Sequence, residues 1–186
     1  MFRYERPQKG RLRQFYQIGV EAFGSAGPAA DAEVISMLYA FLQRVGINGL
    51  NIELNSMGCE NCRPKYREAL MGFFSDGLGH LCPDCGRRFL QNPLRILDCK
   101  VPSCIEQKRG APPVSDYLCG DCTGHFERLN GLLELLSVPF TVNPSLVRGL
   151  DYYTRTIFEV KSSGLGAQNA VSAGGRYDNL VEEFGG

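Results

Sequence analysis

The chain has 186 residues, enough for one good-sized domain or two small ones, and its hydrophobic fraction of 44% is ordinary for a globular protein. Equal numbers of basic and acidic side chains give a formal net charge of zero, which argues against non-specific nucleic-acid binding over the whole surface. The sequence contains no apolar run that could span a membrane and no secretory signal, so we expect a cytoplasmic protein.

The first 24 residues predict a β-hairpin, with a turn at 7–10 and a second strand from about Leu12. Because strand side chains alternate, Phe15, Gln17 and Glu21 fall on one face of that strand. The other face is expected to be its core side and carries Tyr16, Ile18, Val20 and Ala22.

Basic residues are concentrated in this predicted hairpin, which carries a single acidic residue, Glu5, in its first thirteen positions. The basic residues are Arg3, Arg6, Lys9, Arg11 and Arg13. Arginine binds phosphate through two parallel hydrogen bonds, and an exposed Phe15 ring can stack on a nucleobase. The pattern favours a site for an anionic, aromatic ligand that also carries an amine for Glu21. A solvated strand beside a basic loop is the alternative.

The segment 31–45 predicts a helix that begins at an Asp31 N-cap and stops at Gly46. Its apolar residues recur at helical spacing: Val34, Leu38, Phe41 and Val45. Alternation of leucine and isoleucine over 49–55 then predicts a strand.

Between residues 58 and 141 the pattern is helical and rich in cysteine, which predicts an insertion within a β-rich core formed by 1–57 and 142–186. One helix is expected from Pro64 to about Leu78. A second is expected around 126–136, before Pro139. The fold class is therefore α+β, a sheet flanked by helices and interrupted by a helical insertion.

All eight cysteines lie in the insertion as four close pairs: Cys59 and Cys62, Cys82 and Cys85, Cys99 and Cys104, Cys119 and Cys122. In a cytosolic protein such pairs indicate structural Zn²⁺ rather than disulfides. Reduced thiols in a small core, or the remnant of a metal site, are the alternatives. The two histidines, His80 and His125, are expected to be surface or packing residues, with His125 a possible substitute ligand.

The spacing also bears on which pairs share a metal. A helix over 64–78 would be about 22 Å long, and residues 79–81 can return only about 10 Å. The sequential combination of 59/62 with 82/85 is therefore disfavoured. In the nested combination, 82/85 shares one metal with 99/104, and 59/62 shares another with 119/122. The outer two pairs would then meet at the starts of two helices, where the positive helix end favours thiolates.

After a predicted strand at 139–143, the run 146–156 places a guanidinium, a carboxylate and two phenols within six residues. On an extended strand Arg148 and Tyr152 share one face, and Asp151 and Tyr153 the other. Polar groups on both faces indicate that at least one face lines a polar pocket, although a tyrosine-rich sheet edge is possible. Strands at 151–161 and about 168–173 follow, and a short helix is expected from Asp178.

Together these segments resemble the histidyl-tRNA synthetase family of class II aminoacyl-tRNA synthetases. Residues 2–5 with Phe15 resemble the class II motif 2, residues 148–153 resemble the first histidine-specific motif, and residues 174–178 the second. The resemblance extends over nearly the whole chain, including 54–56 and 92–98. It implies a class II antiparallel sheet with a helical insertion near the acceptor arm of the tRNA.

The resemblance also implies a reaction and assigns residues to it. ATP, with Mg²⁺, and L-histidine would form histidyl-adenylate, which is passed to the 3′ end of tRNA(His) by a homodimeric enzyme. The residues that match the ATP site are Arg3, Glu5, Arg11 and Phe15. The residues that match the histidine site are Gln17, Glu21, Arg148, Tyr152, Tyr153, Gly174 and Gly175. Arg148 and Arg3 match the catalytic arginines at the α-phosphate.

Several family features are not found: motif 1, the upstream Thr-x-Glu segment, the motif 3 arginine and the anticodon-binding domain. We therefore expect an internal fragment that is inactive, or nearly so, by itself in histidine-dependent ATP–pyrophosphate exchange. One rival interpretation is the synthetase-like regulatory subunit of ATP phosphoribosyltransferase, which the complete set of motif residues disfavours. Another is a zinc-stabilised nucleic-acid-binding module, which leaves the 148–153 constellation unexplained.

Overall fold

The computed structural model describes the chain except residues 5–11, 149–151, 165–169 and 186. Its larger elements are α1 (Pro28–Arg44), β1 (Leu50–Ser56), α2 (Arg63–Ser75), α3 (Pro83–Gln91), α4 (Pro102–Gln107), α5 (Gly120–Leu135), β2 (Phe140–Val142), β3 (Thr154–Ser162), β4 (Ala170–Arg176) and α6 (Leu180–Glu183). Short 3₁₀ turns occupy Leu78–His80, Pro93–Ile96 and Val114–Tyr117. The α+β class predicted from the sequence is confirmed.

The strands form one sheet in the order β2-β1-β3-β4. Strand β3 pairs antiparallel with β1 and β4, whereas β2 runs parallel to β1, so the sheet is mixed rather than wholly antiparallel. The parallel pair is possible because the whole helical insertion and α5 separate β1 from β2 in sequence, and parallel neighbours need a long crossover.

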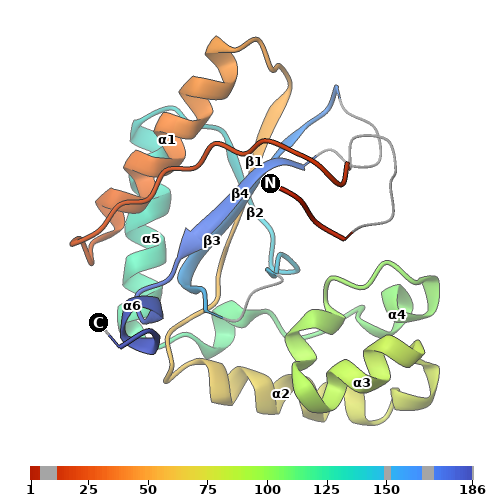
Figure 1. Cartoon of the computed structure of the whole chain (residues 1–186). Helices are drawn as coiled ribbons and strands as arrows, with labels where there is room; N and C mark the ends of the chain where they lie inside the picture. Colours follow the sequence, from red (N-terminus) through yellow and green to blue (C-terminus); the bar gives the residue numbers. More distant parts are fainter. Residues whose placement is uncertain (5–11, 149–151, 165–169, 186) are drawn as a thin grey trace.

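Helices α1 and α5 lie side by side against one face of this sheet (Figure 1). Alternation in β1 and β3 directs their buried apolar side chains toward the helices, and Leu54 is paired with Phe158 and Ile52 with Val160. The helices contribute Ile35, Leu42, Leu129 and Leu133 to the same core. Helix α5 falls inside the predicted 58–141 insertion, yet its leucines belong to the core of the sheet.

Helix α1 ends as predicted, because Arg44 is followed by Gly46 at φ +84°, a conformation that glycine adopts without steric cost. Its start is different. The N-cap is Gly27, and Asp31 lies in the first turn with its side chain buried. The predicted apolar stripe is also partly wrong, because Phe41 and Val45 are exposed.

The insertion forms a second layer beyond one end of the sheet, where α2, α3 and α4 gather (Figure 1). It has its own core, built from Tyr66, Leu70, Phe74 and Ile96 together with three buried cysteines. Helix α2 begins with Pro64 in its first turn as predicted, but it ends at Ser75 rather than Leu78. The sequence interpretation did not include α3 and α4.

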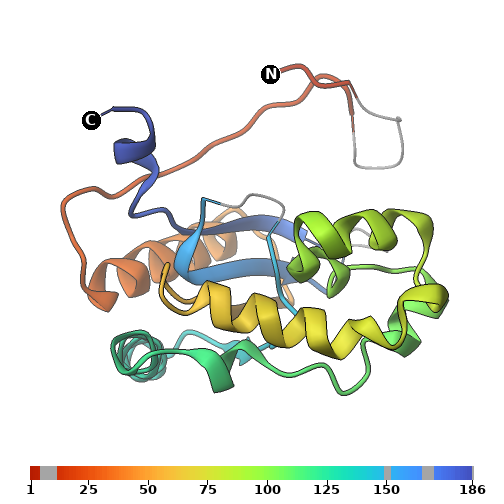
Figure 2. The ribbon, with the colours of Figure 1, turned by 90° about the horizontal axis from the view of Figure 1, so that it is seen from below.

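The N-terminal segment lies apart from the sheet (Figure 2). A Phe2–Gln14 bridge and backbone bonds from Arg3 to Arg13 and from Phe15 to Met1 pair the two arms of the predicted hairpin, whereas its predicted turn at 7–10 lies outside the described residues. Residues 15–23 are not assigned to a strand, and the expected core face is wrong, because Tyr16 and Ile18 are 92% and 86% exposed. A strand is held by its neighbours, and no other strand of the described residues pairs with this one.

Among the residues that the structure describes, no helix is long and apolar enough to cross a lipid bilayer.

Candidate functional site

Polar side chains from three separate segments meet at the end of the sheet where β3 begins and β4 ends. Tyr152 and Tyr153 immediately precede β3, and their ring centroids are 4.8 Å apart. Tyr177 immediately follows β4, and its ring is 6.2 Å from that of Tyr152 in an edge-to-face contact. Phe23, from the N-terminal segment, contacts the other side of Tyr177 at 6.4 Å. These rings hold three hydroxyl groups in one small region.

Two charges of opposite sign act on this tyrosine group. Burial raises the pKa of Tyr152. The neighbouring Tyr153 and Glu21 raise that pKa further, and the positive charge of the Arg148 guanidinium lowers it. Burial likewise raises the pKa of Tyr177, and the negative charge of the Glu21 carboxylate raises it further. Both phenols therefore stay protonated at neutral pH and can donate hydrogen bonds. Arg148 and Glu21 are thus both close enough to Tyr152 to act on its charge.

Two polar atoms of this site are buried without a hydrogen bond among the described residues: the Nε of Arg148 and the hydroxyl of Tyr177. One terminal nitrogen of Arg148 reaches the Oε1 of Glu159 at 3.4 Å. A buried polar atom without a partner is costly, and such atoms are rare in folded proteins. The Nε of Arg148 is therefore available to a bound polar ligand, whereas the hydroxyl of Tyr177 lies close to the Glu21 carboxylate.

Glycines let the backbone approach this site closely. A Cβ at Gly175 would lie 2.8 Å from a ring carbon of Tyr153 and 2.6 Å from the carbonyl oxygen of Thr156. A Cβ at Gly174, on the other face of β4, would lie 2.8 Å from the ring of Phe158. Only the first of these two predicted binding residues faces the tyrosines.

An open pocket of about 270 Å³ lies beside the tyrosine group, between the 20–25 segment, α1 and the end of β4. Its lining includes Glu21, Gly175 and Tyr177 but not Arg148, Tyr152 or Tyr153. Of the three tyrosines, Tyr177 alone lines this pocket.

The floor of this region is fixed by a buried polar network around Asp31. Its carboxylate accepts a hydrogen bond from Thr156 at 2.6 Å, contacts the Nε2 of His125 at 2.8 Å and binds the guanidinium of Arg176. Arg176 also donates to the carbonyl of Ser25 at 2.7 Å. The network joins α1, α5, β3 and β4 directly beneath Tyr177. Reasoning from the sequence missed the network, because Asp31 was expected as a helix N-cap and Arg176 only as part of the 174–178 motif.

The other predicted ligand-binding residues are placed differently. In the hairpin the Arg3 guanidinium lies 4.5 Å from the centre of the Phe15 ring, a cation–π contact away from the tyrosine group. Gln17 is exposed on the same segment. Glu5 and Arg11 lie outside the described residues. The structure thus places Glu21, Arg148, both tyrosines and Gly175 in one region, whereas Arg3 and Phe15 pack against each other within the hairpin.

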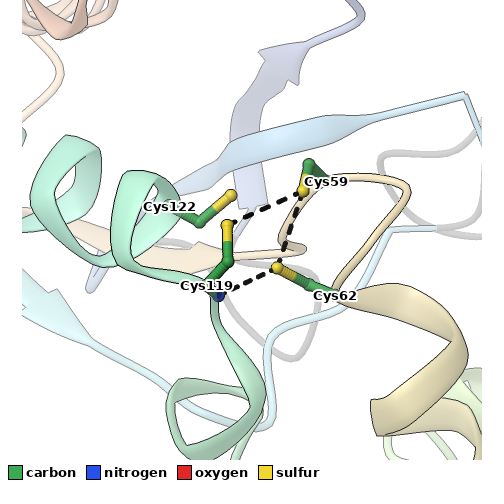
Figure 3. Close-up of side chains that lie close together, drawn as sticks. All are labelled: Cys59, Cys62, Cys119 and Cys122. Atoms are coloured by element: carbon green, nitrogen blue, oxygen red, sulfur yellow. Dashed lines mark hydrogen bonds between the residues drawn. The ribbon is translucent and has the colours of Figure 1, made fainter.

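The eight cysteines form two groups, in the nested combination that the spacing favours. Cys59, Cys62, Cys119 and Cys122 make the outer group (Figure 3), and Cys82, Cys85, Cys99 and Cys104 make the inner group. Within each group the sulfur atoms lie within 4.8 Å of one another. A hydrogen bond from the Cys85 backbone outweighs desolvation and lowers the pKa of Cys82 to about 7, which favours its thiolate. His125 is not a member of either group.

The chain was compared with known proteins. Residues 1–60 and 108–186 match the family model described as histidyl-tRNA synthetase. The histidine–tRNA ligases of Thermodesulfovibrio yellowstonii and Syntrophotalea carbinolica are 59% and 54% identical over the whole chain. The chain spans 44% of the length of each. The crystal structure of apo Staphylococcus aureus histidyl-tRNA synthetase superposes with a TM-score of 0.66 at 34% identity, covering 88% of this chain and 40% of that one.

Proposed function

The chain belongs to the histidyl-tRNA synthetase family, and we propose that it carries the histidine-recognition part of a histidine–tRNA ligase. The reaction would join L-histidine to ATP, supplied as its Mg²⁺ complex, to give histidyl-adenylate and pyrophosphate. The histidyl group would then pass to tRNA(His). A cytoplasmic location and a homodimeric assembly belong to the same proposal.

One observation carries the proposal: the phenols of Tyr152, Tyr153 and Tyr177 converge at one end of the sheet, Glu21 and Tyr177 line the neighbouring pocket, and the Nε of Arg148 is buried without a partner among the described residues. This set of groups is complementary to an amino acid. Glu21 would pair with the ammonium group, and the phenols of Tyr152 and Tyr153 would donate to the imidazole. A pocket built around such hydrogen bonds rejects amino acids that lack the matching polar group.

Arg148 would act at the reacting end of the ligand. Attack of the histidine carboxylate on the α-phosphate builds negative charge on the phosphate oxygens, and a guanidinium fixed in advance stabilises that charge. The unpartnered Nε of Arg148 supports this role. Arg3 would hold the same phosphate and Phe15 would stack on adenine, with Glu5 and Arg11 nearby. These roles require the hairpin to lie closer to the tyrosine group when ATP is bound.

Gly174 and Gly175 would keep the backbone of β4 close to the bound histidine, and Gln17 would donate to it from the N-terminal segment. The cysteine groups take no part in this chemistry, because they contain none of the proposed substrate-binding residues. Any metal that they hold would be structural. The regulatory-subunit alternative is not favoured, because the curated relatives with 59% and 54% identity are named as ligases.

The proposal can be tested with a chimera in which residues 1–186 replace the matching segment of the Thermodesulfovibrio yellowstonii ligase. We expect histidine-dependent ATP–pyrophosphate exchange and charging of tRNA(His). Loss of one transition-state donor typically costs a factor of about 10² to 10³ in kcat. Arg148→Ala should lower kcat by that amount, whereas Glu21→Gln should mainly raise KM for histidine.

Lys65→Ala, at an exposed position of α2, is the matched control and should exchange at the parent rate. Arg148→Lys keeps a charge but loses the planar fork, so it should recover only part of the activity. A chimera whose exchange is unaffected by Arg148→Ala and Glu21→Gln would contradict the assignment of this site.

A further inference from the structure

The spacing of the sulfur atoms matches the dimensions of a mononuclear metal site. A tetrahedral Zn²⁺ with Zn–S bonds of 2.3 Å holds its sulfurs about 3.8 Å apart. In the outer group the Cys59 sulfur lies 3.6 Å from that of Cys62 and 3.9 Å from that of Cys119. In the inner group the Cys82 and Cys99 sulfurs are 3.9 Å apart. Each group therefore already has the size of a four-thiolate site.

Disulfides do not explain these contacts. A disulfide joins its sulfurs at about 2.05 Å, and all eight cysteines are free thiols. Each group contains four sulfurs rather than two, which is the complete ligand set of a closed structural zinc site.

A Zn²⁺ bound by four thiolates carries a net charge of −2. The donors around the inner group can offset this negative charge. Lys108 donates to the carbonyl oxygens of Leu97 and Cys99 at 2.6 and 3.0 Å. Arg88 reaches the sulfur of Cys85 at 3.9 Å. The backbone N–H of Cys82 donates to the sulfur of Cys104 at 3.2 Å. The Arg88 guanidinium and the Cys82 N–H thus contact sulfurs directly, and the Lys108 ammonium lies against the backbone of Cys99; such cations and N–H groups are the outer partners expected of a metal–thiolate site.

The outer group lies where the insertion leaves and rejoins the sheet. Cys59 and Cys62 follow β1 and lead into α2, and Cys119 is the N-cap of α5 (Figure 3). The N–H of Cys119 donates to the sulfur of Cys62 at 3.1 Å. Before Cys59, the backbone at 57–58 bonds to Arg155 on β3 in both directions, at 2.6 and 2.9 Å.

We propose that the chain binds two zinc ions, each through four cysteine thiolates, and that the outer ion fastens both ends of the insertion to the sheet. The inner ion builds the core of the insertion itself. Neither site has an open coordination position for a substrate, so both are structural. Soft, tetrahedral sulfur sites take zinc or iron, and the closed four-sulfur sets favour zinc. This inference does not depend on the proposed ligase activity.

The first experiment is metal analysis of the 186-residue chain purified without chelator. We expect about two zinc ions per chain from two four-cysteine sites. Cys122→Ser in the outer group and Cys85→Ser in the inner group should each leave one. His80→Ala is the matched control, because this exposed histidine is two residues from Cys82 but belongs to neither group, and it should retain both ions.

If a cysteine variant fails to fold, a cobalt titration of the unmodified chain still shows whether it has two thiolate metal sites. We expect two equivalents of Co²⁺ to be taken up, with the visible absorption of tetrahedral cobalt–thiolate centres, and to be displaced by zinc. Less than half an equivalent of zinc, no cobalt–thiolate absorption, iron in place of zinc, or fewer than eight titratable thiols in the metal-free chain would overturn the proposal.

Substitutions at two glycines test the outer site by itself while all eight cysteine ligands are kept. A Cβ at Gly58, whose φ is +64°, would lie 2.5 Å from the Cβ of Cys62, whereas a Cβ at Gly86, beside Cys85, would meet nothing within 4 Å. Gly58→Ala should therefore release one zinc ion at a chelator concentration at least tenfold lower than the unmodified chain. Gly86→Ala should keep both zinc ions up to the same chelator concentration as the unmodified chain. Equal zinc retention by both variants would overturn the outer site.

Discussion

At the scale of single residues, the polar face of the sheet carries an ion-pair chain that bears on stability. Glu53 on β1 accepts hydrogen bonds from Lys161 and Asn143, both at 2.7 Å. Lys161 also lies 3.6 Å from Glu159, which in turn contacts Arg148. The chain of charges runs across β1 and β3 to the proposed catalytic arginine.

Glu53 gives a pH-dependent prediction. Burial acts to raise the pKa of Glu53, but the hydrogen bonds from Lys161 and Asn143 outweigh it, so the folded-state pKa lies below its usual 4.5. The stabilisation is therefore complete above pH 4.5 and is lost as pH falls through the lowered folded-state value. Glu53→Gln should lower the free energy of unfolding by about 1 kcal/mol at pH 7. The difference from the parent should shrink toward pH 3 in urea titrations.

Glu134→Gln, at an exposed position on α5, serves as the control and should match the parent at both pH values. A deficit of Glu53→Gln that stays constant from pH 7 to pH 3 would mean that the carboxylate does not stabilise the fold through its charge.

Gly175 gives a steric prediction. Gly175→Ala should displace the Tyr153 ring and weaken histidine binding, because the added methyl would lie within 3.0 Å of Tyr153, Thr156 and Ile157. Overpacking of this kind costs about 1–3 kcal/mol of stability. Calorimetric histidine titration and urea unfolding of the chimera would measure both effects. Gly72→Ala, inside α2 with open space around it, should instead stabilise by about 0.5–1 kcal/mol.

At the scale of elements, four segments depend on one buried carboxylate. Asp31 on α1 holds His125 of α5, Thr156 of β3 and Arg176 of β4. Removing one member of a buried ion pair leaves the other charge uncompensated, which typically costs about 3–5 kcal/mol. Asp31→Ala should therefore lower the free energy of unfolding by that amount. Asp84→Ala breaks a solvent-exposed pair with Arg87 and should cost less than about 1 kcal/mol. The midpoints of urea unfolding of the two variants and of the parent chain would measure this difference.

The elements that could be predicted from the sequence are those whose local signals agree with their packing. Strand β1 follows from strict alternation, and α2 follows from Pro64 in its first turn. Helices α3 and α4 have nine and six residues, too short to show a full apolar periodicity. Cys85 on α3 and Cys104 on α4 belong to the inner sulfur group, so these two short helices are held by contacts between them and not by a periodic apolar face.

The site was only partly predictable for a similar reason. The motif runs pointed to Glu21, Arg148 and the tyrosines, and the structure brings these together. Tyr177 lies in the 174–178 motif, although no role was assigned to it, whereas His125 and Asp31 were not expected there, because their contacts join segments up to 145 residues apart and no local pattern encodes them. The exposed face of the N-terminal segment was missed because alternation predicts which residues share a face, not whether a neighbour covers it.

At the scale of the whole molecule, two separate hydrophobic cores divide the chain. One lies between the sheet, α1 and α5, and the other lies within α2–α4 and their connections. The second contains Cys85, Cys99 and Cys104 among its buried residues. The stability of the two halves should therefore depend differently on metal.

Chelation tests this division. Adding a strong zinc chelator to the intact chain should remove hydrogen-exchange protection from α2, α3 and α4 while α1 and the β1–β3 pair stay protected. Loss of structural zinc removes ligand bonds that hold a small core together. Protection should return when zinc is restored. The same exchange profile with and without chelator would show that the insertion is stable without metal, and a simultaneous loss everywhere would show a single cooperative unit.

The place where the insertion departs and the place where it returns are both at the outer sulfur group. The family model matches the chain on either side but not over residues 61–107. Because the segment begins and ends at one place, its length can change while the paired strands keep their register. A change in the size of α2–α4 and their connections would thus leave the sheet, α1 and α5 in place.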